Sequence, residues 1–144
     1  MQAIDLVFRK VLSNKILNKF IKLIRHEIKK NKHKELQVFS EILEEKIIIL
    51  EKFAKWLEEK LNIQKDDVSA SCNDFLKILG YVSLGFAWLK MSRVSIENSD
   101  KNKNFYEEKI NTAKYYFDKI IPRIDSHYQS ALAGSESIMN AKFN

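Results

Sequence analysis

The chain has 144 residues, 45% of them hydrophobic and 31% charged, which is typical of one soluble domain with its own core. A single cysteine excludes an internal disulfide, and three glycines with one proline leave few positions for tight turns, so long helices are favoured. The net charge of +6 accompanies abundant lysine, asparagine and isoleucine, a combination that codon bias in an AT-rich genome produces. Charge alone is therefore weak evidence for a nucleic-acid partner.

The sequence shows neither a secretory signal nor a membrane-spanning run. No apolar run approaches the roughly 20 residues that a membrane-spanning helix needs, and the N-terminus lacks the basic and apolar regions of a secretory signal. We therefore expect no transmembrane segment and a cytoplasmic location, which the single cysteine also fits.

Two helices are predicted in the first 30 residues. Apolar spacing indicates a short helix over residues 3–12, followed by a break at Ser13 and Asn14 that also offers an N-cap. The second helix runs to about Lys30. Four apolar side chains define one side of it: Ile16, Phe20, Leu23 and Ile24. Residues 29–34 contain no apolar side chain and are expected to form a solvated turn.

A longer helix is predicted over residues 35–61. Its apolar side chains recur every three or four residues, as in a helix packed within a bundle: Leu36, Phe39, Leu43, Ile47, Leu50, Ala54, Leu57 and Leu61. The charged residues expected to face water are Glu44, Glu45, Lys46, Glu51, Lys52, Glu58 and Glu59. A polar connection is expected over residues 62–71, in which Asp67 or Ser69 caps the next helix.

The segment over residues 70–96 is apolar on nearly every side. Such a helix belongs in the middle of a bundle, or against another subunit or domain. Four small residues within it form a strip where another helix can approach closely: Gly80, Ser83, Gly85 and Ala87. The residues that we predict to form an interface are Gly80, Gly85, Trp88 and Met91.

The last helix follows a linker at residues 97–104. It is expected to begin near Phe105, to bend at Pro122, which has no backbone N–H to donate, and to end or bend at Gly134, before residues 136–139. Its expected apolar face consists of Tyr106, Ile110, Ala113, Phe117, Ile120, Ile124 and Tyr128. These elements predict an all-α, up-and-down helical bundle of four to five helices.

No set of residues has the spacing of an active site, so we assign no catalytic, cofactor-binding or metal-binding residue. The sequence has no Gly-rich nucleotide loop, no paired cysteines and no Glu-x-x-His motif. Of the histidines, His33 is expected to be solvated and His127 to make a surface contact near Asp125. Cys72 lies among apolar neighbours and is expected in the core. The aromatic residues expected in the core or an interface are Trp56, Phe86 and Trp88.

Four blocks of the sequence resemble a known family. Residues 2–10 (QAIDLVFRK) resemble the IQALDLVGRK segment of long acyl-CoA dehydrogenases, although Phe8 stands where that pattern usually has glycine. Residues 75–91 (FLKILGYVSLGFAWLKM) resemble the FLRLFGLVALGWMWLRMA helix of the extra C-terminal domain in those enzymes. Residues 105–122 resemble its F…KLATARFYAERLLP helix, and residues 133–139 (AGSESIM) resemble its AGADSLMAL ending.

This resemblance implies the C-terminal domain of the acyl-CoA dehydrogenase family, in the long form with an acetyl-CoA dehydrogenase-like C-terminal domain. Residues 1–12 would then be the tail of a core-type helix, and residues 13–144 the C-terminal helical bundle. In that family a Tyr-Glu-Gly-Thr segment precedes the first block, and its Glu abstracts the α-proton of the acyl-CoA. The chain begins after that point, so we expect it to lack the catalytic base and most of the FAD site.

The function implied is that of a detached structural or docking domain of an FAD-dependent acyl-CoA dehydrogenase, a flavoprotein family of fatty acid metabolism. We expect no FAD in this chain and no activity in isolation. The expected partner is a separately encoded dehydrogenase core, or a second copy through self-association. Two alternatives stay open: a free-standing Lys-rich module that binds an acidic partner, either nucleic acid or an anionic membrane, and a gene remnant without function. Independent catalysis ranks last.

Overall fold

The computed structural model describes residues 2–13, 15–134 and 140, and these residues form helices and short connections. The elements in chain order are α1 (Gln2–Asp5), η1 (Leu6–Leu12), α2 (Ile16–Lys30), η2 (Lys34–Leu36), α3 (Gln37–Lys60), α4 (Lys65–Glu97), α5 (Lys103–Tyr115), η3 (Tyr116–Ile120) and α6 (Arg123–Leu132). Here η1 and η3 are π-helical, and η2 is a single 3₁₀ turn. The predicted all-α helical bundle of four to five helices is confirmed.

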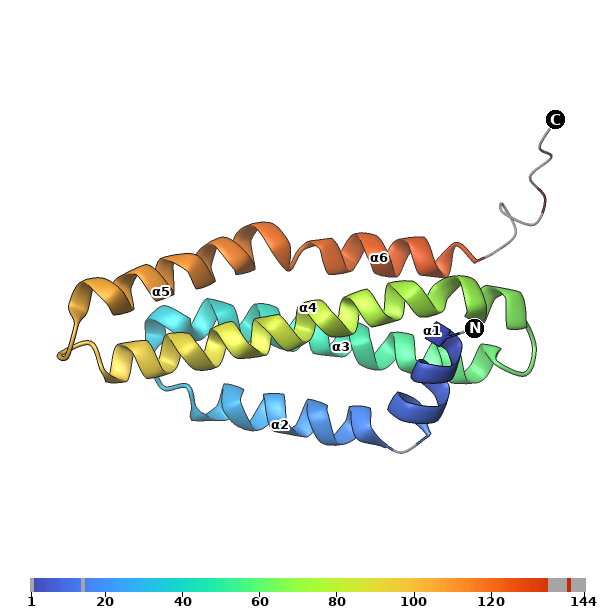
Figure 1. The fold of residues 1–144 in the computed structure, drawn as a ribbon, viewed down its shortest axis with the longest axis horizontal. Coiled ribbons are helices and arrows are strands. Elements are labelled where there is room, and N and C mark those ends of the chain that lie inside the picture. Colours follow the sequence, from blue (N-terminus) through green and yellow to red (C-terminus); the bar gives the residue numbers. More distant parts are fainter. Residues whose placement is uncertain (1, 14, 135–139, 141–144) are drawn as a thin grey trace.

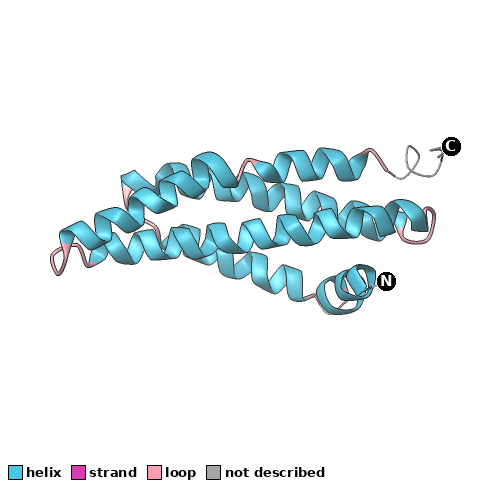
Figure 2. Cartoon of the chain, turned by 45° about the horizontal axis from the view of Figure 1, so that its top comes forward, coloured by secondary structure: helices cyan, strands magenta, loops and turns pink. Residues whose placement is uncertain are grey.

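α4 is the central helix of the bundle. Figure 1 shows it running the length of the molecule, with the arm formed by α5 and α6 along one side and α2 along the other, while α3 lies behind it. α4 contacts each of these helices. α1 and η1 turn across the end of the bundle instead of running along it, as both views show (Figures 1 and 2). The central position of α4 follows from its sequence, because a helix that is apolar on nearly every side needs neighbours all round.

α3 supplies the most regular part of the core. The apolar residues expected on its inner side are all buried except Leu61, which is half-buried: Leu36, Phe39, Leu43, Ile47, Leu50, Ala54 and Leu57. Phe39 stacks on Phe117 of η3, with ring centroids 4.5 Å apart. Phe53 packs edge-to-face against Phe75 of α4 at 5.4 Å. These aromatic pairs, worth about 0.5–1.5 kcal/mol each beyond their buried area, join α3 to the later helices.

The buried side of α2 differs from the predicted one. Leu17, Ile21 and Ile24 are buried, whereas Ile16 and Leu23 are 48% and 53% exposed. α2 has apolar residues on more than one side, and its contacts with α3, α4 and η1 decide which of them are covered. Local spacing alone could not make that choice.

The break before α2 is confirmed, but its cap differs from the prediction. Lys15 occupies the N-cap position with a left-handed backbone (φ 54°) and makes no side-chain cap hydrogen bond. The hydroxyl of Ser13 instead donates to the carbonyl of Arg9 at 2.6 Å, which closes the preceding helix. Asn14, the other residue at the predicted break, lies outside the described residues.

α4 begins earlier than predicted. Its first residue is Lys65, so Asp67 and Ser69 lie inside the helix and do not cap it. Asp66 and Asp67 occupy the first turn, where a carboxylate is favourable beside the partial positive charge of the helix N-terminus. Polar residues that suggested a loop therefore begin a helix.

The last arm follows the prediction. The side chain of Asn102 caps α5 by accepting a hydrogen bond from the backbone N–H of Phe105 at 3.2 Å. Pro122 separates η3 from α6, and the resulting break in the arm is visible in Figure 1. Gly134 follows α6 with φ +72°, a conformation that glycine adopts without strain. The predicted segment at residues 136–139 lies outside the described residues.

Candidate docking surfaces

Buried ionisable side chains form pairs that brace neighbouring helices. Arg93 of α4 donates to Glu27 of α2 at 2.6 Å, and the two side chains are only 15% and 6% exposed. Arg25 of α2 also lies between Glu44 and Glu51 of α3, but these three side chains are 37%, 36% and 40% exposed. Hydrogen bonds to these carboxylates raise the pKa of both arginines. A carboxylate held by a guanidinium braces two helices and is not available as a general base.

Two side chains that the sequence placed at the surface bridge distant helices instead. Lys46 of α3 is buried and donates to Asp125 Oδ1 of α6 at 2.9 Å. His127, expected to make a surface contact near Asp125, is half-buried and contacts Asp74 Oδ1 through Nδ1 at 2.9 Å. Its ring also stacks on Tyr81. The prediction that Lys46 faces water was wrong, because its partner lies 79 residues away along the chain; the partner of His127, 53 residues away, is equally beyond the reach of local patterns.

Reactive groups in the described region are enclosed or dispersed. Cys72 is fully buried, as predicted, and burial raises the pKa of its thiol to about 11, so the thiol is protonated at neutral pH. His33, which we expected to be solvated, is half-buried, and its Nε2 lies 3.8 Å from Oε1 of Glu97. Within residues 2–13, 15–134 and 140, no three His, Cys, Asp or Glu side chains are arranged to hold a metal ion. The same residues include no helix that is both long and apolar enough to cross a membrane.

The structure places the four predicted interface residues in different surroundings. Gly80 is exposed, and a Cβ added there would have open space around it. Gly85 is buried, and a Cβ there would lie 3.0 Å from Cδ1 of Ile121. Trp88 is half-buried against the core, as are the other predicted core or interface aromatics, Trp56 and Phe86. Met91 is 40% exposed. Of the glycines in the small-residue strip, Gly85 therefore lies inside the bundle, whereas Gly80 lies on its surface.

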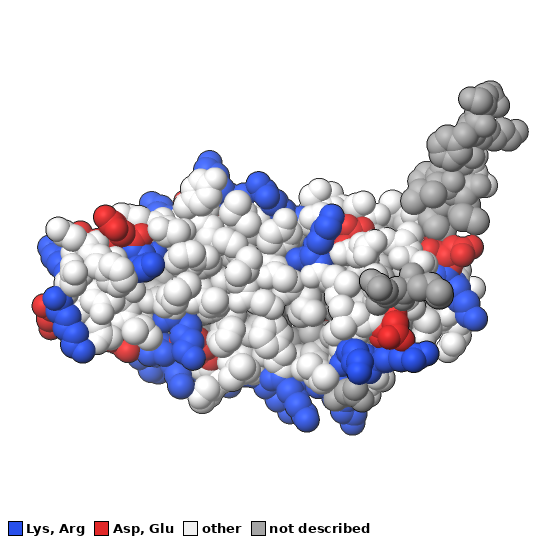
Figure 3. All heavy atoms as spheres, viewed as in Figure 1, with Lys and Arg blue, Asp and Glu red and all other residues white. Residues whose placement is uncertain are grey.

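One row of residues on α4 stays open to solvent. We call it the outer seam: Gly80, Leu84, Ala87, Met91 and Val94, of which Ala87 is half-buried and the others are exposed. Its larger members remain well exposed, with Leu84 at 52% and both Met91 and Val94 at 40%. The row repeats every three or four residues, which is the spacing of a helix-packing seam. Figure 3 shows that charged side chains lie mainly around the edge of this face, while its middle is largely uncharged.

A shallow apolar groove continues the outer seam toward α5. It has a volume of about 340 Å³ and lies between the C-terminal half of α4 and the first turns of α5. Met91 and Val94 form one side, and Phe105, which is 48% exposed, lies on the other. Lys90 and Lys109 also line the groove. The open apolar surface is therefore wider than α4 alone.

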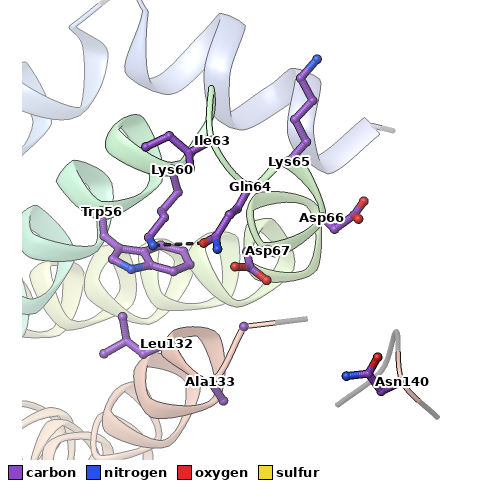
Figure 4. A pocket seen from close by; sticks show the side chains of 11 residues that line it. Trp56, Lys60, Ile63, Gln64, Lys65, Asp66, Asp67, Leu132, Ala133 and Asn140 are labelled. Carbon is purple, nitrogen blue, oxygen red and sulfur yellow. Dashed lines mark hydrogen bonds between the residues drawn. The ribbon is translucent and has the colours of Figure 1, made fainter. Parts of the chain in front are cut away.

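A second surface lies at the end of the bundle where α3 passes to α4. We call it the end face, a hollow of about 580 Å³ lined by Trp56, Lys60, Ile63, Gln64, Lys65, Asp66, Asp67, Leu132, Ala133, Gly134 and Asn140. Figure 4 shows residues of α3, of the α3–α4 turn and of the end of α6 around this hollow. Ile63 is 75% exposed and Leu132 is 44% exposed. α1 and η1 lie at the same end of the molecule (Figure 1).

Sequence reasoning missed the most exposed members of both surfaces. Leu84 and Val94 share the spacing of Gly80 and Met91, so the same repeat could have identified them. Ile63 and Leu132 gave no comparable signal, because Ile63 lies alone between Asn62 and Gln64 and Leu132 lies between two alanines. Only the folded chain brings them to one end of the bundle.

The family model described as acetyl-CoA dehydrogenase C-terminal like matches residues 18–142, which is most of the chain. The matched region includes all of α3 and α4, and therefore the outer seam. No curated protein matches the chain.

Proposed function

Because this chain belongs to the acetyl-CoA dehydrogenase C-terminal-like family, we propose that it is a docking domain that packs on the core of an FAD-dependent acyl-CoA dehydrogenase and performs no catalytic step itself. The observation that carries the proposal is the family match over residues 18–142. FAD, the acyl-CoA substrate and the catalytic base belong to the core in this proposal. The proposed process is the oxidation of acyl-CoA in fatty acid metabolism, in the cytoplasm.

The ionisable groups of the described region support a non-catalytic role. Its most buried charged pair, Glu27 with Arg93, joins α2 to α4, and Lys46 with Asp125 joins α3 to α6. The thiol of Cys72 is sealed in the core. A general base or nucleophile must reach a substrate. Glu27 and Cys72 are instead enclosed in the bundle, and Asp125, whose side chain is 49% exposed, is paired with Lys46.

The end face is the surface that we propose contacts the core. α1 and η1, which the resemblance assigns to a core-type helix, lie at this end of the bundle. Ile63 and Leu132 expose apolar surface there, beside the polar first turn of α4. An apolar centre with a polar rim is the usual composition of a protein–protein interface.

The test is capture of a flavoprotein by the tagged chain from an extract of its native cell. We expect the eluate to show flavin absorbance and to contain, by mass spectrometry, an acyl-CoA dehydrogenase core. A colourless eluate without such a core, from an extract in which the core is detectable, contradicts the proposal. Capture that disappears steeply with added salt would favour the Lys-rich module, because exposed charge contacts are screened by salt.

Matched variants locate the contact. Ile63→Glu combined with Leu132→Glu places two carboxylates on the end face, and we expect capture of the core to fall at least tenfold. Val38→Glu is the control, since Val38 is 58% exposed on the first turn of α3, away from the end face. Equal capture by both variants would exclude the end face as the contact.

A further inference from the structure

The outer seam of α4 has the composition of a helix interface, yet none of the described helices covers it. α4 is buried along its other side, where Phe75, Val82 and Leu89 pack in the core. Leu84 and Met91, on the outer seam, are as hydrophobic as those core residues but remain 52% and 40% exposed. Apolar rows of this regularity on a surface helix indicate an interaction site.

We propose that a second copy of this chain covers the outer seam, with the two α4 helices packed antiparallel about a two-fold axis between Leu84 and Ala87. Two copies related in this way use the same surface patch on each chain, as closed dimers do. The contact would be a coiled-coil-like seam in which side chains of one helix fill the spaces of the other.

The order of large and small residues along the seam carries this arrangement. In the antiparallel register, Met91 of one chain lies opposite Gly80 of the other, and Leu84 lies opposite Ala87. Each pair occurs twice, because the axis relates the two chains. A large side chain therefore meets a small one at every central layer, which lets the helices approach closely without voids.

A parallel arrangement does not fit the same residues. It would place Leu84 opposite Leu84 and Met91 opposite Met91, while Gly80 would face Gly80. Layers of two large side chains would alternate with layers that have almost none. Layers of two large side chains are ordinary in parallel coiled coils, but here they would hold the helices apart and leave voids at Gly80 and Ala87, so the order of residues favours the antiparallel register.

The length of α4 allows the area of a stable dimer. α4 has 33 residues and is therefore about 50 Å long at 1.5 Å per residue. A strip about 20 Å wide needs about 40 Å of that length to bury the roughly 800 Å² per partner of a standard interface, so the contact extends beyond the outer seam, which spans about 21 Å from Gly80 to Val94. The apolar groove beside Phe105 contributes to this width.

Charge also fits a contact made by this face. Each copy carries a net charge of +6, so two copies repel one another in general. The five residues of the outer seam are uncharged, although Lys77 precedes them on α4 and Lys90 lines the groove beside Met91. Figure 3 shows the basic side chains mainly around the edge of this face. The contact is therefore expected to strengthen with added salt, which screens the repulsion between the edges.

This dimer does not depend on the proposed docking to a dehydrogenase core. Its surface is the long side of α4, whereas the proposed core contact is the end face. Failure of the dimer test would leave capture of the core unaffected, and failure of the capture test would leave the dimer unaffected.

The test is disulfide cross-linking of the 144-residue chain under mild oxidation with copper–phenanthroline. In the variant Gly80→Cys combined with Met91→Cys, the two positions are about 16 Å apart along one helix, too far to bridge within a chain. They lie opposite one another in the antiparallel dimer, so we expect most of the protein to migrate as a covalent dimer. The single variants Gly80→Cys and Met91→Cys should give less than a tenth of that amount. The native Cys72 is fully buried and supplies the background.

A second pair of cysteine positions keeps the test decisive if the first double variant folds poorly. Lys77→Cys combined with Val94→Cys joins positions that also face one another, and both native residues are exposed. Circular dichroism verifies that each variant is folded. Absence of cross-linking in both folded double variants overturns the proposal, as does equal cross-linking by the single variants, which would indicate a parallel contact. If Leu84→Glu abolishes capture of the core while the chain stays monomeric, the core covers the seam and the proposal is also overturned.

Discussion

Both sides of α4 carry an apolar row, but the two rows differ in what covers them. The inner side places Cys72, Phe75, Val82 and Leu89 against the other helices, and all four are fully buried. The outer seam repeats the same spacing with Gly80 and its neighbours and is open to solvent. A helix with apolar residues on both sides has little amphipathic contrast, so its sequence cannot show which side the same chain covers. The difference teaches that an apolar row can reflect either the fold or an interaction with another chain.

The largest expected contrast between the two sides comes from removing a large side chain. Phe75→Ala should lower the free energy of unfolding by about 3–5 kcal/mol, because it leaves a cavity beside Phe53 in the closed core. Leu84→Ala, on the outer seam, should lower it by less than 1 kcal/mol in the monomer. Urea unfolding at low protein concentration measures both. Similar losses for the two variants would mean that the outer seam is part of the fold itself.

The ion pair between α4 and α2 is expected to give the next largest change in the free energy of unfolding. Arg93→Ala leaves the buried carboxylate of Glu27 without its guanidinium, and we expect a loss of about 3 kcal/mol. In the double variant Glu27→Met with Arg93→Met, an apolar pair replaces the ion pair, and most of that loss should be recovered. Urea unfolding of the single and double variants provides the comparison. If the double variant is as unstable as Arg93→Ala, the pair contributes more than charge compensation.

Thiol reactivity compares how accessible the two sides of α4 are to a reagent, without altering the core. At pH 8 the thiol of Cys72 should react with Ellman's reagent at least 100 times more slowly than in urea, because it is buried and its pKa is raised to about 11. The added thiol of the Gly80→Cys variant should react within a few fold of a free thiol when the chain is dilute. A fast reaction of Cys72 in the folded chain would show that the inner side opens readily.

The pH dependence of stability should follow from the same thiol. Below pH 9, the ordinary value for cysteine, the thiol keeps its proton in both the folded and unfolded chains. Between pH 9 and 11 the unfolded chain releases the proton while the folded chain retains it, so this group favours unfolding as pH rises. Cys72→Ala should therefore flatten the decrease in stability over that range, as urea titrations at several pH values would show. An unchanged slope would mean that the thiol is not protected.

The smallest expected effect distinguishes the two helical glycines. Gly80→Ala should stabilise the chain by about 0.5–1 kcal/mol, since the site is open and alanine favours the helix. Gly85→Ala should destabilise it by about 1 kcal/mol, because the new methyl group lies 3.0 Å from Ile121 and 3.1 Å from Leu43. Thermal unfolding of both variants measures the sign. Stabilisation by Gly85→Ala would show that the core around it has room.

Periodic apolar spacing predicted the parts of the fold that depend on local pattern. α3 was predicted to within a few residues because its row from Phe39 to Leu57 faces one continuous core. Pro122 and Gly134 fixed the break and the end of the last arm through backbone chemistry that holds in any context. The start of α4 was missed because Asp66 and Asp67 suggest a loop by composition, although they suit a first helical turn.

Side chains that pair across the bundle could not be predicted. Lys46 is one of several lysines on α3, and only the approach of Asp125 from α6 makes its burial favourable. His127 pairs with Asp74 for the same kind of reason. Of the predicted interface residues, Gly85 is enclosed by the fold and Gly80 is open, because the outcome depends on which helices surround α4.

Sedimentation equilibrium of the wild-type chain, beside Leu84→Glu and Val38→Glu, tests most directly whether the outer seam of α4 is an interface. The monomer has a mass of 17.0 kDa. We predict about 34 kDa for the wild-type chain and for the control Val38→Glu at micromolar concentration, and 17.0 kDa for Leu84→Glu with its helical content unchanged. A wild-type chain that stays at 17.0 kDa, or a Leu84→Glu variant that remains dimeric, would contradict the account.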